Sequence, residues 1–136
     1  MTADAALLGF AGSMRTFAPP AVLAARGRVR GRPRVALVAM GLQELAYDKI
    51  PGIPSRAEWW GVAARGTSSG LSAASFMGPE GGAVAAASAV GSTYLTVKAR
   101  QWVCARTGWR DQYYALAEDA VCVALLWAAT RRAATV

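Results

Sequence analysis

The sequence predicts an all-α fold: a polytopic membrane helix bundle of four or five segments, some kinked, short or re-entrant. The chain of 136 residues is 54% hydrophobic and only 17% charged, whereas soluble chains are typically about 45–50% apolar and about 25% charged. Ionisable residues also lie inside its apolar runs, where a membrane would force them toward the protein interior. Because the length suits one domain, we expect residues 1–136 to form a single integral membrane domain.

The first segment covers residues 5–25, close to the roughly 20 residues that cross a hydrocarbon core about 30 Å thick. Pro19 and Pro20 lack backbone donors and disfavour a helical conformation in the residue before each of them. We therefore expect a kinked or broken helix, with Arg15 well placed to serve the carbonyl groups that the break leaves without partners.

The second segment begins near Val35 and ends firmly at the Pro-Gly-Ile-Pro sequence of residues 51–54. Glu44 and Asp48 are four residues apart, which places both on one face of the helix. This segment spans a membrane only if the protein interior holds these two carboxylates.

The third and fourth segments are predicted at residues 61–77 and 83–99, joined by a tight turn at 78–82. Ser55 and Glu58 have the spacing of a capping box in front of the third segment. Small residues recur every four positions in both segments and predict close packing between helices instead of exposure to lipid. They are Gly66 and Gly70 in the third segment, and Ala83, Ala87 and Gly91 in the fourth.

The fifth segment runs over residues 113–130 and carries Glu118 and Asp119. Adjacent residues on a helix point about 100° apart. We therefore expect only one of these two carboxylates to face the centre of the bundle.

The basic residues explain the net charge of +7 and gather at the ends of the apolar segments. This distribution is typical of membrane topology, and the five arginines of residues 26–34 predict a cytoplasmic link, with anionic lipid as a secondary ligand. A second basic link, with Lys98, Arg100, Arg106 and Arg110, then falls on the opposite side, unless one segment is re-entrant. No nucleic-acid-binding motif accompanies the charge, so nucleic acid is not an expected partner.

The chain contains no histidine, which excludes a histidine-dependent triad or a histidine-based metal site. Cys104 and Cys122 lack the spacing of a disulfide framework or a zinc site, and we expect both to be reduced or inert. No phosphate-binding loop or nucleophile elbow is present. The sequence therefore predicts no metal, no cofactor and no enzyme activity.

Four stretches together resemble an uncharacterised bacterial membrane family, domain of unknown function 4126. They are residues 12–19 (Gly-Ser-Met-Arg-Thr-Phe-Ala-Pro), 44–51 (Glu-Leu-Ala-Tyr-Asp-Lys-Ile-Pro), Arg65 with the Gly/Ser run after it, and 116–119 (Leu-Ala-Glu-Asp). The resemblance covers residues 7–126, and its most specific part is residues 44–51. It implies a small multi-helix membrane protein and supplies no reaction.

Seven charged residues are the candidates for a substrate-binding or ion-binding site. They are Arg15, Glu44, Asp48, Lys49, Arg65, Glu118 and Asp119. The carboxylates could hold a cation or a proton, and the arginines an anionic substrate. The alternative is a set of internal ion pairs that fixes helix packing, in particular Glu44 or Asp48 with Arg15 or Arg65. Lys49 is expected to extend to the membrane interface.

These observations favour a transporter or channel for a small ion or solute in the plasma membrane of a bacterium. The alternative is a structural or accessory membrane protein that packs against a partner complex, and a membrane enzyme acting on lipids is a third, weaker hypothesis. The expected partners are the lipid bilayer, further copies of the chain in a homo-oligomer, and another membrane protein.

Overall fold

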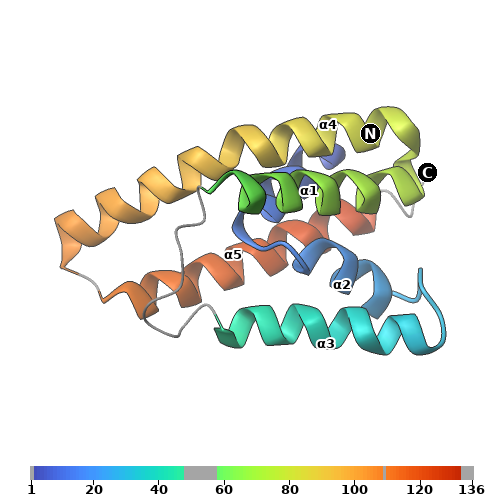
Figure 1. Cartoon of the computed structure of the whole chain (residues 1–136), viewed down its shortest axis with the longest axis horizontal. Helices are drawn as coiled ribbons and strands as arrows, with labels where there is room; N and C mark the ends of the chain where they lie inside the picture. The colour runs from blue at the N-terminus through green and yellow to red at the C-terminus, as the bar shows by residue number, and fades with distance from the viewer. Residues whose placement is uncertain (1, 48–57, 109, 133–136) are drawn as a thin grey trace.

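The computed structural model describes residues 2–47, 58–108 and 110–132, and the regular secondary structure of this part of the chain is all helix, without a strand (Figure 1). The all-α prediction is therefore confirmed. The helices are α1 (Thr2–Met14), α2 (Ala18–Ala25), α3 (Arg32–Tyr47), α4 (Trp59–Thr107) and α5 (Asp111–Arg132).

Helix α1 lies at the centre of the bundle and packs mainly against α4 and α5. Its buried residues occupy most of its circumference and are nearly all small. A Cβ atom added at Gly9 would lie 2.1 Å from the carbonyl oxygen of Ala85. The missing side chain thus lets the backbones of α1 and α4 approach each other directly.

The predicted break in the first segment is confirmed, and it falls at residues 15–17. Pro19 and Pro20 lie just inside α2, in its first turn, where a missing N–H removes no helical hydrogen bond. The chain turns at this break, so that α2 leads back toward the end of the molecule where α1 begins (Figure 1).

Helix α3 begins three residues before the predicted start and is the most peripheral helix in the described structure. It packs mainly against α2, and a Cβ atom on its buried Gly41 would lie 2.6 Å from the Cβ atom of Ala21. Most of its other side chains are exposed, including Val35 at 70%.

Helix α4 is a hairpin of two helical halves that turn at Gly78, whose φ of 79° and ψ of 176° are not helical (Figure 1). The predicted turn at residues 78–82 is thus a single residue, because the helix resumes at Pro79. The halves meet through small residues, as predicted: a Cβ atom on Gly70 would lie 3.1 Å from that of Ala86, and one on Gly82 would lie 2.8 Å from that of Ala74.

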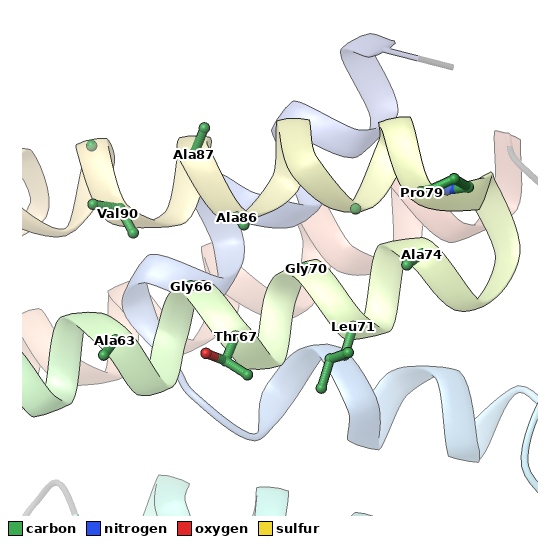
Figure 2. Close-up of a pocket in the computed structure, with 12 residues that line it drawn as sticks. Ala63, Gly66, Thr67, Gly70, Leu71, Ala74, Pro79, Ala86, Ala87 and Val90 are labelled. Atoms are coloured by element: carbon green, nitrogen blue, oxygen red, sulfur yellow. The ribbon is translucent and has the colours of Figure 1, made fainter.

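The predicted packing of Ala83, Ala87 and Gly91 is wrong, because all three are exposed and nothing lies within 4 Å of a Cβ atom built on Gly91. Figure 2 shows Ala86 pointing between the two halves of α4 and Ala87 pointing away from them. A stripe of small residues therefore does not by itself identify the buried face. A shallow apolar groove lies between the two halves of α4 and is lined by residues that include Gly66, Gly70, Ala86 and Val90 (Figure 2).

Two predicted boundaries also change. The second half of α4 continues to Thr107, so Lys98, Arg100 and Arg106 lie on a helix and not in a link. Glu58 is the N-cap of α4, not the third residue of its first turn, and its side chain makes no capping hydrogen bond. The predicted capping box is therefore wrong, and Ser55 lies outside the described residues.

Among the described helices, length and composition mark only residues Asp111–Arg131 of α5 as able to cross a membrane. The helical architecture is thus established, and a bundle with several membrane crossings stays a prediction.

Replacing Gly9 with alanine should destabilise the bundle, because the new methyl group would overlap the backbone of Ala85. Overpacking of this kind costs about 1–3 kcal/mol. The matched change Gly91→Ala adds the same methyl group in open space and should be neutral or slightly stabilising. Thermal unfolding of the purified variants measures the difference, and equal melting temperatures would contradict the α1–α4 packing.

Candidate functional site

The largest fully buried side chain in the described structure is that of Arg15, which is 1% exposed. It lies at the break between α1 and α2, where the last carbonyl groups of α1 have no partner within the helix. Its Nη1 donates a hydrogen bond of 3.0 Å to the carbonyl oxygen of Met14. The predicted role of this arginine at the break is therefore confirmed.

Both acidic residues of α5 reach the same guanidinium. Arg15 Nη2 donates a hydrogen bond to Asp119 Oδ1, and Nη1 lies 3.9 Å from Glu118 Oε2. The expectation that only one carboxylate faces the centre is wrong, because the guanidinium fork is wide enough to meet two neighbouring side chains. Glu118 is buried, whereas Asp119 is half-buried.

A second arginine extends this cluster toward the turn between α4 and α5. Arg100 Nη1 lies 3.7 Å from Glu118 Oε2. Arg100 also holds Asp111 through two bonds, Nε to Oδ1 at 2.7 Å and Nη2 to Oδ2 at 2.5 Å. The resulting row of alternating charges, which we call the ionic ladder, consists of Asp111, Arg100, Glu118, Arg15 and Asp119.

Arg100 was predicted in a basic link, and its place in the ionic ladder was not predicted. A signal for it exists at Gly108, which ends α4 in the left-handed conformation that favours glycine. Such an ending predicts a helical hairpin. Arg100 and Glu118 lie at similar distances from this turn along the chain, so a hairpin brings them together.

Glu44 of α3 binds the backbone on the other side of the break. Its Oε1 accepts a hydrogen bond of 2.6 Å from the Thr16 N–H, and its Oε2 accepts one of 2.7 Å from the Phe17 N–H. The carboxylate thus sits at the N-terminus of α2, where the helix dipole favours negative charge. The predicted ion pair of Glu44 with Arg15 or Arg65 is replaced by this contact with the main chain.

Helix α4 completes the surroundings of the break. Ser68 donates a hydrogen bond to the carbonyl oxygen of Thr16. Ser69 is fully buried, and a Cβ atom on Gly12 would lie 1.9 Å from its hydroxyl oxygen. Arg65 is buried one turn earlier on the same side of α4. The predicted site residues Asp48 and Lys49 lie outside the described residues.

Five of the seven predicted site residues are thus placed, and four of them surround one break in a helix. Arg15 donates to a carbonyl group at the end of α1, and Glu44 accepts from two N–H groups at the start of α2. Glu118 and Asp119 form ion pairs with Arg15. Glu44 and Asp119 are half-buried, so the centre is not closed to water at these two carboxylates.

Neither cysteine forms a disulfide. The buried Cys122 thiol donates a weak hydrogen bond of 3.3 Å to the carbonyl oxygen of Ala11 and helps to join α5 to α1. Within the described residues, no group of three or more Cys, Asp or Glu side chains is placed to hold a metal ion.

A scan against protein-family models found no matching family, and searches of curated proteins and of solved structures found no matching relative. The resemblance to domain of unknown function 4126 therefore stays a prediction.

Replacing Arg15 with methionine should lower the free energy of unfolding by about 3–5 kcal/mol, because it leaves Glu118 and Asp119 without their buried partner. The triple variant Arg15→Met, Glu118→Gln, Asp119→Asn should recover part of this loss. Chemical denaturation measures both free energies. The matched control is Arg106→Met at an exposed position, which removes a contact with the Trp102 ring and should cost about 0.5–1 kcal/mol. A cost for Arg15→Met no larger than the control's would contradict the central role of this ion pair.

Replacing Glu44 with alanine should cost about 1–3 kcal/mol for each backbone N–H that it strands at the break. Glu44→Gln keeps one side-chain oxygen as an acceptor and should fall between alanine and the wild type. Amide hydrogen exchange at Thr16 and Phe17 reports the effect directly. Protection that is unchanged in the alanine variant would show that these amides do not depend on Glu44.

Proposed function

We propose that this chain is a small multi-pass membrane protein of the bacterial plasma membrane that transports a small ion or solute. Its distribution of polarity supports the membrane part of the proposal. The interior holds charged and hydroxyl side chains, led by Arg15, while large apolar side chains such as Leu71 and Leu95 are 69% and 65% exposed. Water does not favour such an arrangement, whereas lipid solvates the apolar surface and confines the charges to the inside.

The two ends of the molecule also suit the two faces of a bilayer. The link of residues 26–34 and the C-terminal end of α5 lie at one end, and the turn between α4 and α5 lies at the other (Figure 1). At that second end the basic residues are fewer and more widely spaced than the five arginines of residues 26–34: they are Lys98, Arg100, Arg106 and Arg110. We therefore place the end with residues 26–34 in the cytoplasm.

The broken helix at the charged centre is the observation that carries the transport proposal. Transporters commonly bind ions and solutes where discontinuous helices expose backbone groups inside the membrane. Here the Met14 carbonyl group accepts a hydrogen bond from Arg15, and the Thr16 and Phe17 N–H groups donate to Glu44. A transported cation would replace the N–H groups as the partner of Glu44, and a transported anion would replace the carbonyl group as the partner of Arg15.

The ionic ladder supports the same conclusion. Glu118 lies 3.9 Å from Arg15 and 3.7 Å from Arg100, both longer than a hydrogen bond, so this carboxylate is shared between two arginines. A shift of Glu118 toward either arginine would weaken its attraction to the other. Buried charges are also expensive relative to apolar residues of similar size, which favours their retention for a function.

A structural or accessory role is the second candidate, and a different observation favours it. Arg15, Glu44 and Asp119 are each held by a direct hydrogen bond, as expected if the charges serve only to fix helix packing. The apolar groove on α4 would then receive helices of a partner membrane protein or of a further copy of the chain (Figure 2).

Flux measurements in proteoliposomes separate the two candidates. With gradients of protons, Na⁺, K⁺ and Cl⁻ as probes, Glu118→Gln and Asp119→Asn should reduce the flux of the transported ion to the level of empty liposomes. Glu80→Gln removes the same charge from an exposed position and should leave flux unchanged. Gel filtration checks that all variants assemble alike. Unchanged flux in both central variants, or no flux for any probe with a stable partner at fixed stoichiometry, would favour the accessory role.

A further inference from the structure

Two adjoining cavities lie where α2, its link to α3, the turn of α4 and the end of α5 meet. The first has a volume of about 190 Å³ and the second about 380 Å³. They share Leu23, Arg28 and Phe76 in their linings. The first cavity alone would hold roughly six water molecules at about 30 Å³ each, which is room for a phosphate group.

Arg26 enters the first cavity in a fixed position. Its Nη1 donates a hydrogen bond of 2.8 Å to the Thr130 hydroxyl, and its guanidinium lies over the Trp127 ring at 4.9 Å from the centroid. The Thr130 hydroxyl is itself held, because it donates to the carbonyl oxygen of Leu126 at 2.7 Å. Since one N–H of the five on the guanidinium serves Thr130, the others are available to an anion.

Described acidic side chains do not balance the charge of Arg26 and Arg28 at this site. Within the described part of the chain, neither Arg26 nor Arg28 forms an ion pair, in contrast to Arg15 and Arg100. Among residues 2–47, 58–108 and 110–132, no acidic side chain lines either cavity. The remaining arginines of residues 26–34 add to the positive potential, so the first cavity is suited to an anion.

The second cavity has a different character. Its lining is largely apolar, with Leu23, Leu37, Leu71 and Phe76, and its polar members include Ser72 and Ser75. A ligand that fills both cavities therefore carries a negative head and a hydrocarbon tail.

We propose that these cavities bind one anionic phospholipid, with its phosphate between Arg26 and Arg28 and an acyl chain against Leu37 and Phe76. Arginine forks match phosphate oxygens through charge-assisted hydrogen bonds. Basic pockets between membrane helices on the cytoplasmic side bind anionic head groups in the same way. This inference rests on the proposed membrane location, because the lipid reaches the site from the bilayer.

Lipid titration of the full chain in nanodiscs tests the proposal, with phosphatidylglycerol and phosphatidylcholine as the probes and native mass spectrometry as the readout. The wild type should retain phosphatidylglycerol in preference to phosphatidylcholine. Arg26→Gln and Arg28→Gln should each weaken that retention by about tenfold or more, the value of one charge-assisted hydrogen bond. Arg30→Gln and Arg32→Gln remove the same charge from the same region outside both cavities and should retain the lipid like the wild type.

Three results would overturn the inference. Equal loss in all four variants would show a diffuse electrostatic attraction without a site. Displacement of phosphatidylglycerol by millimolar inorganic phosphate would show a site for free phosphate. No preference between the two lipids would show that no head group is recognised.

The membrane location is tested separately by alkaline extraction of the wild-type membranes. Release of the chain into the aqueous fraction would overturn the proposed function itself, whereas a retained chain without lipid preference would overturn only the lipid site. Arg28 is exposed, so Arg28→Gln keeps the test valid even if Arg26→Gln impairs folding.

Discussion

The guanidinium of Arg15 sets the main constraint on this structure, because a charge that is 99% buried must be surrounded by partners. It joins the carbonyl end of α1 to the two carboxylates of α5. The same break leaves the N–H groups of Thr16 and Phe17 outside the helical hydrogen bonds, and both donate to the Glu44 carboxylate of α3. One interruption in one helix thus determines where α3 and α5 must lie.

The small residues of α1 and α4 make this arrangement possible. Three helical segments can surround the break only if their backbones come close, and a side chain at Gly9 or Gly12 would collide with α4. The hairpin of α4 depends on the same property at Gly70 and Gly82. Close packing of backbones replaces the large apolar core of a water-soluble bundle, and most large apolar side chains are left to face outward.

The charges of the molecule fall into two groups with different consequences. In the ionic ladder, three acids alternate with two arginines, from the exposed Asp111 through the buried Arg15 to Asp119. At the other end of the bundle Arg26 and Arg28 line cavities in which the described part of the chain places no acidic side chain. In the function proposed above, the first group would exchange partners with a transported ion, and the second would bind an anionic lipid.

Local chemistry in the sequence predicted the helical class, the break near the two prolines, the close packing at Gly66 and Gly70, and an inward position for Arg15 and one of the two α5 carboxylates. Each of these follows from local chemistry: missing N–H groups, missing side chains, or the cost of charge in an apolar run. The partners of the charged side chains depend on how the helices pack. Glu44 could have met Arg15 or Arg65, and its contact with two amides depends on where α3 lies against α2. Ala83 and Ala87 had the spacing of a buried stripe, yet the packing of the hairpin buries Gly82, Ala85 and Ala89. Gly108 marks the end of α4, but the approach of Arg100 Nη1 to within 3.7 Å of Glu118 Oε2 depends on how α4 and α5 pack after that turn.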